Sequence, residues 1–95
     1  MAKNILTYLF ILKELVTIQR RGQCGNPPDF FAKTFEEYRR GFAANCELWL
    51  GLDKIHELTK TGLWELMIEG TNWKTGQKYT QRYASFRIGP FPRYL

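Results

Sequence analysis

The stretch WLGLDKIHELT, residues 49–59, decides the fold of this chain of 95 residues. The apolar segment Leu48–Leu50 is typical of a short strand, and Gly51 ends it. Apolar residues then recur at a helical spacing that gives one apolar face, namely Leu52, Ile55 and Leu58. We expect this helix to stop at Gly62. The chain therefore contains both strands and helices, and we expect an α+β fold.

A second short helix is expected just upstream, over Thr34–Gly41. Thr34 and Glu37 have the spacing of a capping box, in which each side chain meets a free backbone N–H of the first turn. Aromatic residues at positions 35, 38 and 42 give this helix an apolar face. Gly41 can adopt the left-handed conformation that ends a helix.

The remaining chain reads as strands and turns. Val16–Ile18 is β-branched, and the Gly and Pro residues of positions 22–28 predict a loop. Trp64–Glu69 alternates between apolar and polar residues, as a half-buried strand does. After a turn at 72–76, a strand over 78–88 changes its apolar phase between Tyr83 and Ala84. A β-bulge, or a break into two strands, would explain that change.

Four segments in this order resemble the C-terminal domain of fibrinogen and related lectins. They are residues 17–21, then residues 29–31 with 35–38 and 41–42, then residues 49–59, and last residues 64–66 with Trp73 and 83–89. The segment Asn-Pro-Pro-Asp-Phe-Phe, residues 26–31, is most similar to arthropod tachylectin and techylectin-like proteins and to ficolin-like lectins. The resemblance covers residues 16–95, as the N-terminal half of that domain. Residues 1–15 look unrelated and form an apolar segment, either signal-like or packed on the core.

The resemblance implies a mixed or antiparallel sheet with two short helices. It also implies a secreted protein that is not an enzyme and that binds acetylated sugars on microbial surfaces in innate immunity. Oligomerisation would turn weak sites into avidity. The family's calcium loop and acetyl-group pocket belong to the other half of the domain. No ligand residue is therefore carried over to this chain, and no cofactor is expected in it.

Composition leaves two alternatives open. The net charge of +5 and the pI near 9.4 fit a small basic module that binds anionic polymers. The densest cations are only the pairs Arg20–Arg21 and Arg39–Arg40, which favours a solvated surface and no nucleic-acid partner. The second alternative is a scaffold that acts only in protein association, through exposed strand edges. The apolar run Ile5–Leu12 is too short for a membrane-spanning helix.

Few residues are candidates for a site. The single histidine, His56, forms a surface pair with Asp53 on a helix and is interpreted as structural. The carboxylates are scattered and do not indicate a calcium site. Trp73, in a turn, is a weak candidate for contact with a ligand. Cys24 and Cys46 are interpreted as two unpaired thiols, with a disulfide between them as the alternative.

Overall fold

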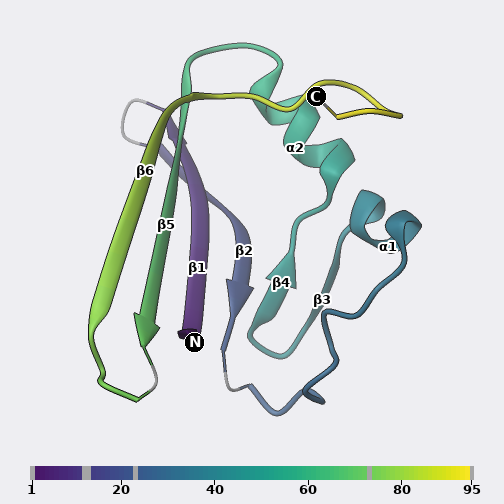
Figure 1. Ribbon diagram of the computed structural model, residues 1–95. Helices are drawn as coiled ribbons and strands as arrows, with labels where there is room; N and C mark the ends of the chain where they lie inside the picture. Colours follow the sequence, from purple (N-terminus) through teal and green to yellow (C-terminus); the bar gives the residue numbers. More distant parts are fainter. Residues whose placement is uncertain (1, 12–13, 23, 73, 95) are drawn as a thin grey trace.

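The computed structural model describes residues 2–11, 14–22, 24–72 and 74–94, and its strands form one six-stranded sheet (Figure 1). The strands follow the order β3-β4-β2-β1-β5-β6, and each neighbouring pair is antiparallel. The strands are β1 (Ala2–Ile11), β2 (Glu14–Arg21), β3 (Phe42–Ala44), β4 (Glu47–Trp49), β5 (Trp64–Asn72) and β6 (Lys78–Phe86). The helices are α1 (Phe35–Arg40) and α2 (Leu52–Thr59). The expected α+β class is confirmed, and the sheet is antiparallel.

The N-terminal segment supplies the strand in the middle of this sheet. β1 pairs with β2 on one side and with β5 on the other. The first partner is adjacent in sequence, whereas β5 begins only at Trp64. The boundary between residues 1–15 and 16–95 stays a prediction.

Both helices begin where the sequence places them. At α1 the backbone N–H of Glu37 donates to Oγ1 of Thr34 over 3.2 Å, and the N–H of Thr34 donates to Oε1 of Glu37 over 3.1 Å. The predicted capping box is confirmed. α2 ends at Thr59, before Gly62, because its last backbone hydrogen bond joins Lys60 N–H to His56 O over 2.9 Å.

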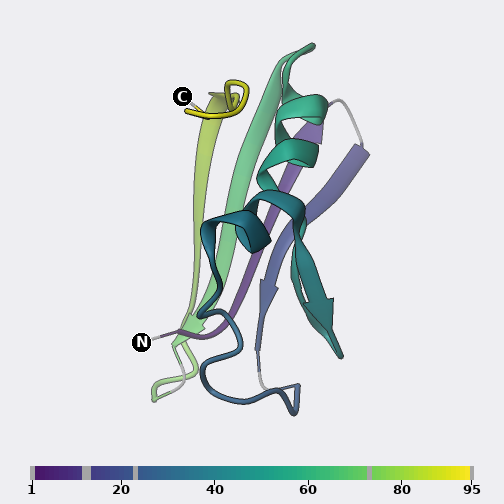
Figure 2. The same ribbon diagram turned by 90° about the vertical axis from the view of Figure 1, so that its right-hand side faces the viewer.

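The core lies between the sheet and α2, on the face that carries both helices (Figure 2). Its buried members are Ile18, Ile55 and Trp64. Burying a side chain such as that of Ile55 contributes roughly 1.5–3 kcal/mol. The hydroxyl of buried Thr59 donates to Ile55 O over 2.9 Å and accepts from Ile88 N–H over 3.1 Å. This pair of bonds ties the segment after β6 to α2.

The phase change predicted between Tyr83 and Ala84 is a β-bulge. Trp64 pairs with Phe86, and Leu66 pairs with Tyr83, so one more residue lies on β6 than on β5 between these pairs. Ser85 accommodates the extra residue with a φ of 59°. β6 ends at Phe86, two residues before the predicted end.

Two glycines let the end of α1 approach the start of α2 closely. Gly41 has a φ of 96°, and a Cβ built on it would lie 2.2 Å from Leu50 O. Gly51 has a φ of 113°, and its Cβ would lie 2.7 Å from the carbonyl of Arg40. Any side chain at either position would force these backbones apart. The close approach of α1 and α2 therefore requires glycine at both positions, and Gly51 lies within the stretch 49–59 that decides the fold.

Candidate functional site

The sheet face opposite the helices carries a polar hollow. Arg20 and Glu69 both pair with Leu6, and Glu69 also pairs with Thr80. Residues aligned in this way across a sheet point to the same face. Trp64 belongs to the core and lies an odd number of positions from Glu69 on β5, so its side chain points to the other face. Arg20, Glu69 and Thr80 therefore lie together on the face away from α2.

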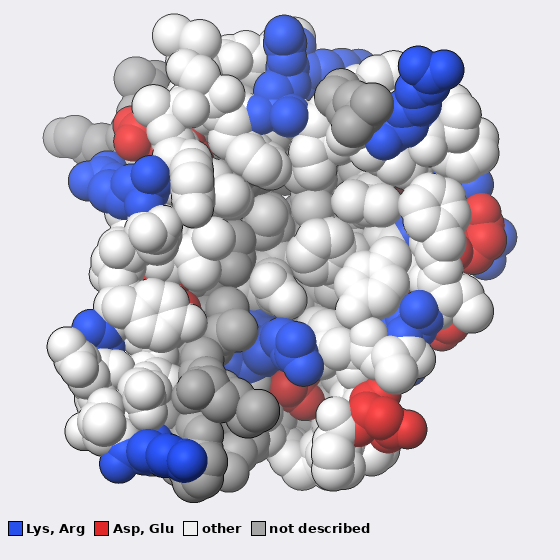
Figure 3. Space-filling model, in the orientation of Figure 1, with Lys and Arg blue, Asp and Glu red and all other residues white. Residues whose placement is uncertain are grey.

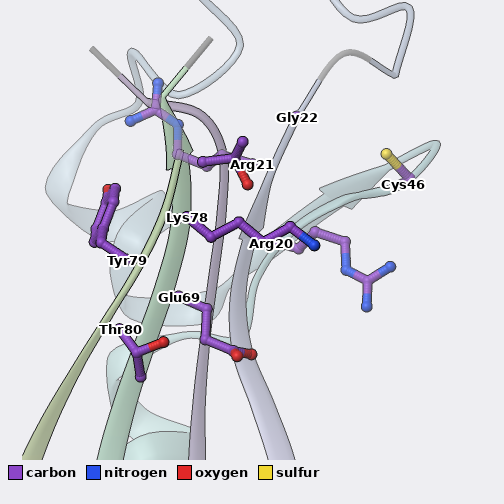
Figure 4. A pocket seen from close by; sticks show the side chains of 10 residues that line it. Arg20, Arg21, Gly22, Cys46, Glu69, Lys78, Tyr79 and Thr80 are labelled. Carbon is purple, nitrogen blue, oxygen red and sulfur yellow. The ribbon is translucent and has the colours of Figure 1, made fainter. Parts of the chain in front are cut away.

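The hollow has a volume of about 490 Å³ and is open to solvent. Side chains from three strands contribute to its lining, and Figure 4 shows it from close by. The principal polar ones are Arg20, Glu69, Thr71, Lys78 and Thr80. A volume of this size falls within the range of small-molecule pockets, roughly 300–1,000 Å³.

Positive charge prevails in this hollow. Among the described residues, the lining includes Arg20, Arg21 and Lys78 against one carboxylate, that of Glu69. In Figure 4 the Lys78 side chain extends from β6 over the sheet in the direction of Arg20. The guanidinium of Arg21 instead stacks on the Phe31 ring, with 4.3 Å from its central carbon to the ring centroid. Within the described part of the chain, Arg20 and Lys78 are thus the cations that an approaching ligand would meet.

A disulfide holds the loop at one end of the hollow. Cys24 and Cys46 are joined in the structure, with a Cα–Cα distance of 5.5 Å, rather than standing as the two thiols that the sequence favoured. The β3–β4 turn carries Cys46 back to the loop that follows β2, a proximity that sequence spacing does not reveal.

Buried Glu47 adds hydrogen bonds to the same junction. Its carboxylate accepts from Gly22 N–H over 3.2 Å and from the Asn26 amide over 2.9 Å. The Asn26 amide also donates to Ala44 O over 3.0 Å. Since Gly22 and Cys46 line the hollow, these bonds fix the backbone along that edge.

Tyr79 packs on the helix-bearing face of the sheet, because its neighbours Lys78 and Thr80 on β6 point into the hollow. Its ring lies over Gly70, where an added Cβ would come within 2.2 Å of the ring. The pair is a cross-strand contact between β5 and β6, in which the aromatic ring covers the backbone that glycine leaves open. About half of the Tyr79 surface stays exposed.

Of the two site candidates from the sequence, Trp73 and His56, the structure describes only His56. Trp73 lies outside the described residues. His56 is on α2, and its Nδ1 lies 2.8 Å from Ile88 O, which agrees with a structural role. In the sequence, Arg20 stands out only as part of a charged pair, and no signal marks Lys78. Their meeting depends on β1 and β5 lying between them, for which no local sequence signal exists.

A second polar cluster joins the helices to the C-terminal segment. The Asp53 carboxylate accepts from the Tyr94 hydroxyl and from Nε of Arg39, the latter over 3.2 Å. The bond from Tyr94, followed by that from Arg39, lowers the pKa of Asp53. Burial, followed by the Asp53 carboxylate, raises the pKa of Tyr94. Arg39 also lies 4.0 Å from the Phe91 ring centroid. We name Asp53, Arg39 and Tyr94 the clasp, and its role is structural.

Neither a metal cluster nor a membrane-spanning helix occurs in the part of the chain that the structure describes. No three His, Cys, Asp or Glu residues there gather as metal ligands. No helix there is both long and apolar enough to cross a membrane. On the face that Figure 1 presents to the viewer, Lys and Arg are scattered in small groups (Figure 3).

Known proteins resemble this chain along most of its length. A family model described as "Fibrinogen beta and gamma chains, C-terminal globular domain" matches residues 15–94. Angiopoietin-related protein 2 of Homo sapiens is 38% identical over 65 residues, which cover 67% of this chain and 13% of that protein. Fibrinogen-like protein A of Apostichopus parvimensis is 43% identical over 67 residues, covering 68% and 23%.

Techylectin-5A of Tachypleus tridentatus is 49% identical over 43 residues, which cover 44% of this chain and 15% of that protein. The chain thus spans less than a quarter of the length of each of these relatives. No solved structure matches the chain.

Proposed function

The chain belongs to the family of fibrinogen C-terminal globular domains, and from this premise we propose that it is a non-catalytic recognition module for acetylated carbohydrates of microbial surfaces. The polar hollow between β2, β5 and β6 carries this proposal. Its hydroxyl and charged groups are of the kind that hydrogen-bond sugars. Similarity to Techylectin-5A, a lectin by its name, points in the same direction.

The disulfide supports a location outside the cell. Disulfides persist in oxidising compartments and are rare in the reducing cytosol. The pair Cys24–Cys46 closes the loop beside the hollow, so the proposed site depends on a bond that secretion would preserve. In this setting the protein would meet microbial glycans directly.

Amide NMR spectra of the chain, recorded during titration with N-acetylglucosamine in calcium-containing buffer, test the proposal. We expect dispersed peaks and shifts confined to the amides around the hollow, such as those of Gly70, Thr71 and Thr80. Glucose, which lacks the acetyl group, should produce much smaller shifts. Dispersed peaks that do not move with either sugar would contradict carbohydrate recognition by this chain.

A matched pair of variants locates the site. Thr80→Val removes an exposed hydroxyl from the hollow at nearly constant volume. Thr61→Val makes the same change in the exposed bend between α2 and β5. We expect weaker binding in the first variant only. Equal binding in both would place the sugar elsewhere.

Protein association is the second candidate, and the position of β6 favours it. β6 is the last strand of the described sheet, and Lys78–Ser85 are all exposed. An edge strand offers unpaired backbone groups to another chain. Sedimentation velocity at increasing protein concentration would detect such pairing as a growing dimer fraction. A constant monomer across the series would rule out self-association through β6.

A further inference from the structure

We infer that the polar hollow selects acidic sugars, those that carry a sulfate ester or a carboxylate, over neutral ones. This inference rests on the proposed carbohydrate recognition and names its ligand class. It follows from the charge of the hollow, from the unpaired state of its two accessible cations and from the fixed edge beside them.

Arg20 and Lys78 are available to a ligand. Both side chains are exposed, and both line the hollow. The ion pairs found across the described ranges include neither of them. A hydrogen bond from a charged donor to an anion is about twice as strong as one between neutral groups. A sulfate or carboxylate in the hollow would therefore bind more strongly than a hydroxyl there.

Two threonines that line the hollow supply neutral partners for the rest of a sugar ring. Thr71 lies on the same face as Lys78 because the two residues pair across β5 and β6. Thr80 lies on that face because it is two positions after Lys78 on β6. Thr71 is half-buried, whereas Thr80 is exposed. Each hydroxyl can both donate and accept. Two exposed cations together with two hydroxyls fit a sugar that carries one anionic substituent.

The edge of the hollow near Arg20 is held in place before any ligand arrives. The backbone there is held by the Glu47 hydrogen bonds and by the Cys24–Cys46 disulfide. A cation carried on fixed backbone loses less conformational freedom when it binds an anion.

Nucleic acid is the competing anionic ligand, and the hollow suits it less well. Single-stranded nucleic acids bind along grooves in which aromatic rings stack on successive bases. Tyr79 is the aromatic residue in the described lining, but its ring lies over Gly70 on the face of the sheet opposite to Thr80. Two accessible cations match one small anionic group better than a repeating phosphate backbone.

Titration calorimetry at fixed salt with N-acetylglucosamine 6-sulfate, glucuronic acid and neutral N-acetylglucosamine tests the inference. We expect the two acidic sugars to bind about tenfold more tightly than the neutral one, as one charge-assisted hydrogen bond provides. Inorganic sulfate and a short single-stranded oligonucleotide are added as further probes. Equal affinity for neutral and acidic sugars would overturn the inference and leave the proposed function intact. Preference for the oligonucleotide over every sugar would overturn both.

The double variant Arg20→Gln with Lys78→Gln is compared with Arg87→Gln with Arg93→Gln, which removes two exposed cations outside the hollow. The first should lose the preference for acidic sugars, and the second should keep it. Both should unfold at the same urea concentration as the parent chain, which separates lost binding from lost folding. If the two variants lose the preference equally, net charge and not the hollow is responsible. If inorganic sulfate binds as well as the sulfated sugar, the site recognises a simple anion and the inference fails.

Discussion

The two faces of the sheet are built differently. The helix-bearing face is closed by buried apolar residues, by two glycines that allow close backbone contact and by hydrogen bonds from Thr59. The opposite face carries exposed cations over half-buried polar groups. Since burial stabilises a fold and exposure allows binding, the first face stabilises the chain and the proposed recognition belongs to the second. Substitutions on the first face should therefore unfold the chain, and those on the second should leave it folded.

The strongest test of this comparison is Ile55→Ala. The side chain is 0% exposed, and its removal leaves a cavity in the core. We expect a loss of about 2–5 kcal/mol in the free energy of unfolding, measured by urea denaturation. Leu63→Ala removes a side chain that is 80% exposed, and it should change stability by less than about 0.5 kcal/mol. Similar losses in both variants would contradict the placement of the core.

The disulfide should have the next largest effect. Replacing both Cys24 and Cys46 by Ser opens a loop with a sequence separation of 22. The entropy gained by the unfolded chain corresponds to about 3 kcal/mol of lost stability. Thermal unfolding followed by circular dichroism measures the change, and reduction of the parent chain should reproduce it. A melting temperature that does not respond to reductant would show that the bond is absent in solution.

A smaller effect is expected at the start of α1. Thr34→Ala removes the side chain that accepts from Glu37 N–H, and this should cost about 1 kcal/mol of stability. Thr61→Ala, in an exposed bend, serves as the control. The difference in urea midpoint between the two variants is the quantity to measure. No difference would mean that α1 is held by packing alone.

The clasp should give the smallest effect, and it should depend on pH. Because the folded state lowers the pKa of Asp53, its charged form stabilises the fold above the ordinary pKa of about 3.9, and this contribution disappears as the pH falls through the lowered value. Asp53→Asn should therefore be less stable than the parent at pH 7, and the two should converge in strong acid. Urea unfolding at several pH values tests this, with Glu14→Gln as a control outside the clasp. A gap that stays constant in acid would exclude the carboxylate as its cause.

Local signals allowed much of the fold to be predicted. The capping box of Thr34 and Glu37, the helical spacing around Ile55 and the phase change after Tyr83 each depend on residues close in sequence. The strand predicted over residues 64–69 continues to Asn72 in the structure, since its pairing with β1 goes beyond the residues that alternate.

Long-range contacts were beyond such signals. The Cys24–Cys46 bond requires the β3–β4 turn to fold back. The hollow requires Arg20 and Lys78 to lie on one face of the sheet, on strands that two other strands separate. The sequence shows that Arg20 and Arg21 are both cationic. It does not show that their side chains point to opposite faces of the sheet. The family resemblance is confirmed, because it depends on several segments of the chain together and not on one local pattern.

The central place of β1 has a consequence for how the chain folds as it is made. β1 and β2 can pair as soon as both have left the ribosome, but the other edge of β1 stays open until β5 has been synthesised. Closing the sheet then joins segments far apart in sequence, which slows folding relative to a helical protein of this size. An open strand edge during that interval can pair with another nascent chain. The length of chain between β2 and β5 thus sets how long the open edge of β1 can pair with other nascent chains during synthesis.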